Sequence, residues 1–381
     1  MEASKFTIIM ILQLILIFFI IGQFVYFNSR IKRVKIESGN SVSDSLSQTR
    51  FPGNQQALNS DFQFLQSPLA AEQQQNVYAL KLMVKKNWIV NMWRNETPVI
   101  SGRIDKSGTR EFSIPLEYGG NRIRILVLDQ QQNPVNRDEI RIIYHSPRIE
   151  SLKNSVSGAT PENRELALTF DGGADDVHTT EILDILRQNG VRCTLFLTGK
   201  FIEKHPDLVR QMVKDGHEIA NHTYAHPHLT TYAYNHKQEK GSNIDRVFLQ
   251  QQLIKTDSIF HGITQKHLKP YWRAPFGEYN TQILLWAAEL GYRHVRWSEG
   301  FDTYDWVSDA SSKLYRSPGD AYNHFMEAEK NRPNGLNGII VLMHLGSNRN
   351  NNHIFKILPR LIETLREKNY AFKPVSELTL K

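Results

Sequence analysis

The chain has 381 residues, 40% of them hydrophobic and 22% charged, which are ordinary values for folded proteins and exclude a chain that is disordered throughout. This length suggests two or three domains, and the single cysteine, Cys193, excludes an intrachain disulfide and a cysteine-rich zinc module. The net charge is +7, but residues 1–40 hold five Lys or Arg and two Asp or Glu, so the rest of the chain is too weakly charged to predict a nucleic-acid-binding surface.

An apolar run near the N-terminus, residues 6–27, is interrupted by only a few polar residues. About 20 apolar residues span a bilayer, and this run has 22. It ends on Phe24-Val25-Tyr26-Phe27, and such bulky residues suit a signal-peptide cleavage site poorly. We therefore expect an uncleaved anchor rather than a removed signal peptide, and we predict a single transmembrane helix with a basic flank over residues 1–36.

Two further segments follow the predicted anchor. Residues 37–76 include 19 Gln, Ser or Asn among 40, too little apolar surface to offset the entropy of ordering, so we predict a flexible linker. Residues 77–147 contain short runs of alternating apolar and polar residues, with turn signals at Gly119-Gly120 and Asn133-Pro134. This pattern predicts a small antiparallel β-sandwich, which resembles the immunoglobulin-like modules found beside carbohydrate enzymes. Both a spacer role and glycan binding are consistent with it.

The pattern changes again over residues 148–381, where short apolar runs alternate with helical stretches that end in glycine. Examples are Thr179–Asn189, which is followed by Gly190, and Asn243–His261, which is followed by Gly262. Glycine just past a helix adopts the left-handed conformation that caps the last carbonyls. Strand–helix alternation over this length predicts an α/β fold of the barrel type, in which chemistry collects at the carboxyl ends of the strands.

The first predicted strand end is rich in carboxylates. Asp171 directly follows the apolar strand 166–170, and the Gly172-Gly173 turn leads on to Asp175 and Asp176. Two glycines let the backbone turn tightly, which would bring several carboxylates to one rim. An Asp-rich turn that caps the next helix would give the same pattern.

The second strand end carries His222 and His226, which follow the short strand Glu218–Ala220. On a helical turn, residues spaced i and i+4 lie on one face, so both imidazoles could bind a single divalent cation. The alternative is two histidines that serve only the structure.

Three further strand ends carry polar residues. Arg273 lies in a loop stiffened by Pro275, where it could hold a carboxylate or form an ordinary loop salt bridge. Asp302 stands near Trp306 in the sequence, a pattern that plain turn chemistry would also give. His344 ends a long apolar strand, a position that suits either proton transfer or a buried structural histidine. Taken together, the five strand ends supply the side chains needed for metal-assisted hydrolysis of a carbonyl compound.

The order of these motifs resembles the polysaccharide deacetylase family, also called the NodB-homology or carbohydrate esterase family 4 domain. The matching segments are Thr169-Phe170-Asp171, His222-Thr-Tyr-Ala-His226-Pro227, Arg273-Ala-Pro275-Phe276, Asp302-Thr-Tyr-Asp-Trp306 and Leu342-Met-His344. The resemblance covers residues from about 160 to 381, over half of the chain. It implies a distorted (β/α) barrel and the hydrolysis of acetyl groups from a glycan with a divalent metal, zinc first, with cobalt, manganese and nickel as alternatives.

The resemblance also implies roles for the residues on the metal side of the site. His222 and His226 would hold the metal, which would polarise the acetyl carbonyl and lower the pKa of water. Asp171 would take a proton from that water, and Arg273 would orient Asp171.

The remaining roles concern the substrate and the leaving group. The backbone N–H of Phe276, where the family usually has tyrosine, would stabilise the oxyanion, with Pro275 beside it in the substrate-binding loop. His344 would protonate the leaving amine, Asp302 would support its charged form, and Trp306 would form a wall against the substrate.

The sequence departs from the family pattern at two places. The family's first motif usually has a second aspartate that binds the metal, and this position is Gly172. We expect Asp175 to supply the missing carboxylate, with Asp176 or water as alternatives. The second departure is an insertion, Tyr232–Asn243, which is polar and basic and is expected to form a loop beside the substrate.

The leading functional prediction is a membrane-tethered enzyme that deacetylates a cell-envelope glycan, with peptidoglycan as the expected substrate. Chitin-like oligomers, an N-acetylglucosamine exopolysaccharide, O-acetyl esters and a catalytically inactive glycan-binding protein are the alternatives.

The orientation of the anchor gives conflicting signals. Four basic residues follow the anchor and only Lys5 precedes it, so positive-inside counting places the body in the cytoplasm. Long domains can be translocated despite such a bias, so we give the substrate more weight. We expect the catalytic domain on the extracytoplasmic side of the cell membrane, in the periplasm or at the cell surface.

Overall fold

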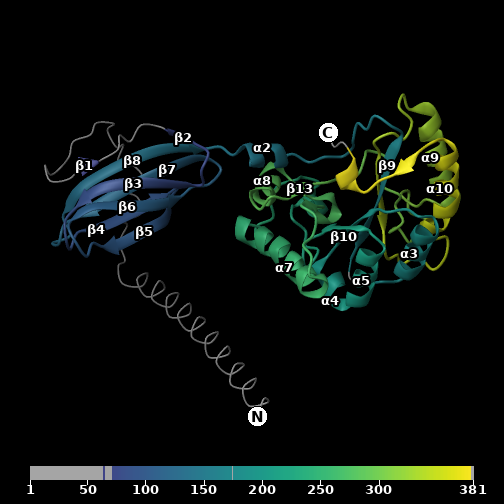
Figure 1. Cartoon of the computed structure of the whole chain (residues 1–381), viewed down its shortest axis with the longest axis horizontal. Coiled ribbons are helices and arrows are strands. Elements are labelled where there is room, and N and C mark those ends of the chain that lie inside the picture. The colour runs from purple at the N-terminus through teal and green to yellow at the C-terminus, as the bar shows by residue number, and fades with distance from the viewer. Residues whose placement is uncertain (1–62, 65–70, 174, 379–381) are drawn as a thin grey trace, which may run out of the picture. The chain divides into compact units, whose positions relative to one another are not determined.

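The computed structural model describes residues 63–64, 71–173 and 175–378 (Figure 1). The predicted membrane anchor, residues 1–36, and most of the predicted linker lie outside these residues. In the part of the chain that is described, no helix is both long enough and apolar enough to cross a bilayer.

The first part of the described chain consists of two β-sheets, with strand orders β1-β3-β6 and β2-β8-β7-β4-β5. The strands are β1 (Gln63–Phe64), β2 (Ala71–Gln73), β3 (Val77–Val84), β4 (Ile89–Arg94), β5 (Thr97–Arg103), β6 (Gly108–Pro115), β7 (Gly119–Leu128) and β8 (Pro134–Tyr144). Alternate residues of β3, such as Leu80 and Leu82, share one buried core with Met92 of β4 and Ile125 of β7. The strands predicted from the alternating pattern are therefore confirmed, while the likeness to immunoglobulin modules stays a prediction.

The two shortest strands of these two sheets, β1 and β2, lie where the sequence predicts a linker. β1 pairs antiparallel with β3, and β2 pairs parallel with β8. The prediction for residues 37–76 rested on side-chain composition, whereas edge pairing is formed by backbone N–H and C=O groups that every residue except proline carries. The C-terminal end of the predicted linker is therefore corrected: residues 71–73 belong to the second sheet.

The second part of the described chain is built around a parallel sheet with strand order β13-β12-β11-β10-β9-β14, and β15 pairs with the start of β9. Its strands are β9 (Glu165–Gly172), β10 (Thr194–Leu197), β11 (Glu218–Asn221), β12 (Tyr271–Trp272), β13 (Arg293–His294), β14 (Ile340–His344) and β15 (Ala371–Phe372). Figure 1 shows the helices lying outside these strands. The α-helices are α2 (Pro147–Leu152), α3 (Thr179–Gln188), α4 (Gly199–Lys204), α5 (Pro206–Lys214), α6 (Tyr232–Asn235), α7 (Arg246–Thr264), α8 (Thr281–Glu289), α9 (Pro318–Asn331) and α10 (Leu358–Glu367), and the 3-10 turns are η1 (Pro275–Gly277), η2 (Ile354–Ile357) and η3 (Val375–Glu377).

The central strands of this sheet are covered on both faces. Every residue of β9 after Glu165 is buried, and so is every residue of β10 and β11, as expected for parallel strands between helical layers. Beyond β13, Ser298 donates its backbone N–H to Ile340 and Phe301 accepts from Leu342, so the chain after one edge strand bonds to the other edge strand, β14. The predicted α/β class is confirmed, and closure into a barrel stays a prediction.

The predicted glycine caps are only partly correct. Gly190 follows α3 and adopts a positive φ of 58°. Gly262 instead lies inside α7, which continues to Thr264 and is capped by Gln265 at a φ of 58°. A glycine within a helix costs about 1 kcal/mol, which the other residues of a long packed helix can offset.

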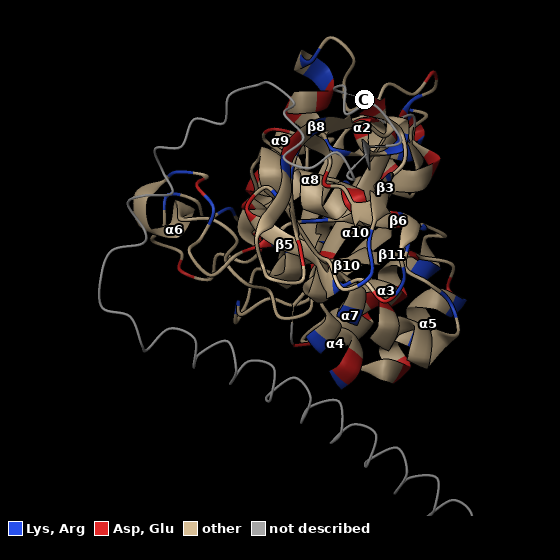
Figure 2. Cartoon of the chain, turned by 90° about the vertical axis from the view of Figure 1, so that its left-hand side faces the viewer, with Lys and Arg blue, Asp and Glu red and all other residues tan. Residues whose placement is uncertain are grey.

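The predicted insertion contains the short helix α6 (Figure 2), and its Lys240 forms an antiparallel bridge with Thr230, which lies just before the insertion. Gln238 joins it to the neighbouring loop, because its side-chain Oε1 accepts from the backbone N–H of Tyr279 at 3.1 Å and its carbonyl accepts from Asn280 at 3.0 Å. The insertion is therefore bonded to the loop that follows Arg273. Figure 2 also shows acidic and basic residues interspersed along the described elements.

Candidate active site

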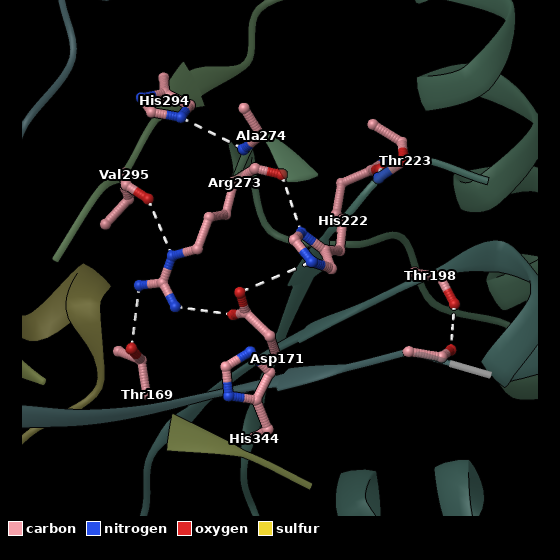
Figure 3. A network of polar contacts seen from close by, with 12 residues as sticks. Thr169, Asp171, Thr198, His222, Thr223, Arg273, Ala274, His294, Val295 and His344 are labelled. Carbon is pink, nitrogen blue, oxygen red and sulfur yellow. Dashed lines mark hydrogen bonds and ion pairs between the residues drawn. The ribbon is translucent and has the colours of Figure 1, made fainter. Parts of the chain in front are cut away.

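The carboxylate of the first motif and the imidazole of the fifth lie side by side at the carboxyl ends of two parallel strands. Asp171 of β9 and His344 of β14 are register partners, and the backbone N–H of Leu345 donates to the Asp171 carbonyl at 3.0 Å. Figure 3 shows the His344 ring beside the Asp171 side chain. Sheet register thus joins residues that lie far apart in the sequence.

A fully buried arginine holds the Asp171 carboxylate. Arg273 donates from Nη1 to Asp171 Oδ1 at 2.7 Å, from Nη2 to the Thr169 hydroxyl at 2.9 Å and from Nε to the Val295 carbonyl at 3.0 Å (Figure 3). Each guanidinium nitrogen therefore has its own acceptor, which satisfies a buried cation and fixes its plane. The predicted contact between Arg273 and Asp171 is confirmed. Thr169 also belongs to this network, although the sequence analysis predicted no role for its hydroxyl.

Electrostatics keeps Asp171 ionised. Burial by itself raises the pKa of this carboxyl, but Arg273, followed by His222 and His344, outweighs burial and holds the pKa below its ordinary value. Opposite charges within a few ångströms favour the charged form in this way. Asp171 is therefore a carboxylate at neutral pH and can accept a proton.

His222 presents one ring nitrogen to Asp171. Its Nδ1 lies 2.9 Å from the Arg273 carbonyl, which can only accept, so the proton belongs on Nδ1 and Nε2 keeps its lone pair. Nε2 lies 3.5 Å from Asp171 Oδ2, and burial lowers the pKa of His222. A bare imidazole nitrogen thus faces a carboxylate oxygen. A shared cation would satisfy both, and a backbone bond on the other ring nitrogen is typical of a metal-binding histidine.

His226 lies beside His222, but not on a helical turn as predicted. The chain over residues 222–229 has no helix, and Thr223 and His226 adopt left-handed φ values of 63° and 55°. This backbone brings the two rings together with their centroids 4.8 Å apart. Burial and then the neighbouring His222 lower the pKa of His226 to about 3. The pair therefore offers neutral imidazole nitrogens, the form that binds metal.

The structure does not bring the predicted third ligand to this pair. Asp175 is exposed and its carboxylate packs closely against Gly346, and Asp176 Oδ2 lies 3.3 Å from His205 Nδ1. Among the described residues, no three His, Cys, Asp or Glu side chains gather as a metal cluster. The assignment of Asp175 as a metal ligand stays a prediction, and in the described residues its side chain lies against Gly346 in the loop after β14.

Position 172 itself points into the apolar core. A Cβ there would lie 2.7 Å from Leu197 Cδ2 and 3.2 Å from Leu345 Cδ1, with Phe201 as the third neighbour. All three side chains are buried. The glycine is therefore needed for close packing, and a carboxylate at this position would begin among hydrocarbon groups.

We expect Gly172→Asp to destabilise the fold without creating a metal ligand. Burying an unpaired carboxylate there should lower the free energy of unfolding by roughly 2–5 kcal/mol, measured by urea denaturation, and calorimetry should show no gain in zinc affinity. Gly173→Asp is the matched control, because a Cβ at Gly173 meets nothing within 4 Å. Tighter zinc binding with unchanged stability in Gly172→Asp would contradict this account.

The hydrogen-bond partner of His344 is Asp305, which the sequence analysis did not single out; Asp302 does favour the charged form of His344, as predicted, but contributes less. Asp305 Oδ1 lies 2.7 Å from His344 Nδ1, and Oδ2 accepts the His344 backbone N–H at 2.7 Å. Asp302 instead accepts the backbone N–H of Tyr304 at 2.8 Å and acts on His344 only at longer range. The left-handed backbone of Tyr304, with a φ of 53°, is part of the turn that brings Asp305 back to β14. Both aspartates belong to the same motif, so the sequence alone could not show which of them forms the hydrogen bond with His344.

This pair sets the charge of the imidazole. Burial alone would lower the pKa of His344, but Asp305, with smaller contributions from Asp171 and Asp302, raises it from 6.5 to about 9. His344 therefore carries a proton at neutral pH, next to a carboxylate that does not.

Two exposed aromatic side chains lie in the third and fourth motifs. Phe276 is 54% exposed and Trp306 is 49% exposed, whereas Pro275, which begins η1, is buried. The apolar faces of exposed aromatic rings can pack against the apolar faces of sugar rings.

Comparisons with known proteins indicate one family. A family model described as polysaccharide deacetylase matches residues 158–295. A peptidoglycan-N-acetylglucosamine deacetylase of Bacillus cereus is 32% identical over 58% of this chain and 92% of the relative. A chitooligosaccharide deacetylase of a Bradyrhizobium strain is 28% identical over 58% of this chain and 93% of the relative.

A solved structure also resembles the chain. The crystal structure of a peptidoglycan N-acetylglucosamine deacetylase aligns with a TM-score of 0.50 and 28% identity, covering 60% of this chain and 94% of that one. The family model matches part of the chain, and the Bacillus cereus relative is matched over nearly its whole length. The chain therefore belongs to the polysaccharide deacetylase family, carbohydrate esterase family 4, whose members are hydrolases.

Proposed function

We propose that this protein removes acetyl groups from N-acetylated sugars of a cell-envelope polysaccharide, with peptidoglycan as the expected substrate. Relatives named for action on peptidoglycan and on chitooligosaccharides support the class of substrate. The observation that carries the proposal is the pair Asp171 and His344. They are register partners, yet Asp171 is paired with a cation, Arg273, and His344 with an anion, Asp305, each at 2.7 Å.

In this pair, Asp171 suits the role of the base and His344 the role of the acid. The charge partners push the pKa of Asp171 down and that of His344 up to about 9, so at neutral pH one is a carboxylate and the other an imidazolium. Neighbouring groups whose environments push their pKa values apart in this way identify the base and the acid of a hydrolytic site.

We propose zinc as the metal, with cobalt, manganese and nickel as alternatives, and His222 and His226 as the residues that would hold it. Two neutral imidazoles suit these ions, but the third protein ligand found in many zinc sites has no candidate beside them other than Asp171 among the described residues. The chemistry that the metal supplies when bound is polarisation of the acetyl carbonyl and a lower pKa for water.

The residues of the chain itself account for the proton transfers. Asp171 accepts a proton from the attacking water, and Arg273 keeps the carboxylate charged and aimed. The backbone N–H of Phe276 donates to the oxyanion that develops as the new C–O bond forms. His344 then gives its proton to the sugar nitrogen as the C–N bond breaks, leaving acetate and a free amine. The rings of Phe276 and Trp306 are exposed to contact the sugar.

The predicted anchor over residues 1–36 would tether the catalytic domain to the cell membrane, and the substrate requires that domain on the extracytoplasmic side. A reporter fused after Lys381 should be active only outside the cytoplasm. Activity confined to the cytoplasm would contradict both the orientation and the wall substrate.

The function is tested by acetate release from the full-length protein with zinc or cobalt added. N-acetylated peptidoglycan, chitin oligomers and an O-acetylated polysaccharide should be compared, and a chelator should abolish release from the preferred substrate. The site also allows a catalytically inactive glycan-binding protein, because position 172 carries no carboxylate. Glycan binding without acetate release from any substrate, with zinc bound, would support that alternative and overturn the enzyme.

We expect Asp305→Asn to move the alkaline limit of activity. In the wild type, acetate release should fall only as the pH rises through about 9, where His344 loses its proton. Without the Asp305 carboxylate, burial dominates, so the pKa of His344 should return toward or below its ordinary 6.5. The pH profile of kcat/KM measures this shift.

The same ion pair should affect stability with a defined sign. Because the folded pKa is raised, its contribution is fully present below pH 6.5 and is lost as the pH rises through about 9. Asp257→Asn is the matched control for both the stability and the pH profile, since it also removes a carboxylate that pairs with a histidine, the exposed His267, at 2.7 Å. An alkaline limit that stays at the same pH in Asp305→Asn would refute the role of this pair.

A further inference from the structure

A buried carboxylate joins the two loops that line the site. Glu278 is 1% exposed; its Oε2 accepts the backbone N–H groups of Leu229 at 2.9 Å and Thr230 at 3.0 Å, and its Oε1 lies 2.7 Å from His228 Nδ1. Leu229 and Thr230 belong to the loop that carries His222 and His226, whereas Glu278 belongs to the loop that carries Arg273 and Phe276. One side chain thus fixes the separation of the two loops.

His228 extends this connection to the site itself. Its ring lies flat on the Phe276 ring, with centroids 3.9 Å apart and planes 8° apart. The Phe276 ring in turn meets His226 edge-on, with centroids 4.5 Å apart. The contacts therefore run from buried Glu278 through His228 and Phe276 to His226.

Phe276 needs such support. Its φ of 57° and ψ of 10° place a bulky residue in the left-handed region, which costs on the order of 1–2 kcal/mol. With half of its side chain exposed, little core packing opposes relaxation to an ordinary backbone conformation. Glu278 holds the His228 ring by a hydrogen bond, and the His228 ring stacks on Phe276. This stack supplies packing that opposes such a relaxation.

We propose that His228 and Glu278 are positioning residues that hold Phe276 in its left-handed conformation and seat it against His226. The direction of the Phe276 N–H depends on this backbone, so the pair would aim the donor for the oxyanion; this part of the proposal rests on the proposed function. Neither residue touches the reacting atoms. They act through Phe276 and through the spacing of the two loops.

Substitution of His228 tests the proposal in the full-length protein. His228→Ala should lower kcat about 10–100-fold and change KM much less, because a misaimed oxyanion donor affects the transition state rather than binding. His228→Phe, which keeps a flat ring on Phe276 but loses the bond to Glu278, should restore only part of the loss. A defect equal in kcat and KM, or no rescue by phenylalanine, would overturn the role.

Hydrogen exchange supplies a readout that does not need activity. Backbone amides over residues 273–280 should exchange faster in His228→Ala than in the wild type. His267→Ala is the matched control, because His267 also pairs with a carboxylate at 2.7 Å and stacks on a second ring, that of His261. If the wild type releases no acetate, the proposed function is wrong, but the hydrogen-exchange rates still test whether His228 positions Phe276. Unchanged exchange in His228→Ala would refute this positioning role.

Discussion

Asp171→Asn should reduce acetate release by about two to four orders of magnitude while the protein still folds. Asparagine keeps an oxygen that can accept from Arg273, so the 2.7 Å contact has a substitute. An amide cannot take a proton from water, and loss of a general base typically lowers kcat by about 10²–10⁴-fold. The measurement is kcat on the best substrate, with circular dichroism to confirm the fold.

The control for this substitution is Asp207→Asn. Asp207 also pairs with an arginine, Arg210, at 2.7 Å, but both side chains are exposed, so acetate release should not change. Glycan binding by Asp171→Asn should remain close to that of the wild type. A loss smaller than about tenfold would show that Asp171 is not the base.

Arg273→Met should cause a large loss of stability. Methionine has a similar length but leaves the Asp171 carboxylate buried without its main charge partner, and it also removes the bonds to Thr169 and Val295. Breaking a buried ion pair from one side costs about 3–5 kcal/mol. Urea denaturation at neutral pH measures this change in the free energy of unfolding.

Arg210→Met removes the arginine of an exposed pair and should cost less than about 1 kcal/mol. Catalysis should respond to Arg273→Met as well, because the pKa of Asp171 should rise once burial is no longer opposed by the guanidinium. If Arg273→Met and Arg210→Met lose similar stability, the buried network contributes less than its geometry indicates.

Much of the fold follows from local patterns that the sequence displays directly. Buried runs such as those around Phe170 and Val341 predict parallel strands, because both faces of each strand are covered. The edge strands β1 and β2 were not predictable in this way, since backbone pairing rather than side-chain pattern forms them. The helix that continues past Gly262 was missed for a related reason: tertiary packing outweighs the propensity of one residue.

The sequence by itself determined which side chains stand at the ends of the strands: Asp171, the two histidines of the second motif, Arg273 and His344. Parallel strands bring their carboxyl ends to one edge, so the composition of the site could be predicted from strand order. The family membership follows from the same residues.

Only the tertiary structure decided how these residues combine. Asp305 rather than Asp302 contacts His344, position 172 faces Leu197 rather than the histidines, and Glu278 bonds to a loop 48 residues earlier. Each of these contacts depends on strand register and on left-handed turns at single residues such as Phe276 and Tyr304. A rotation of one backbone torsion redirects a side chain from one partner to another, and nothing in the local sequence pattern encodes that choice.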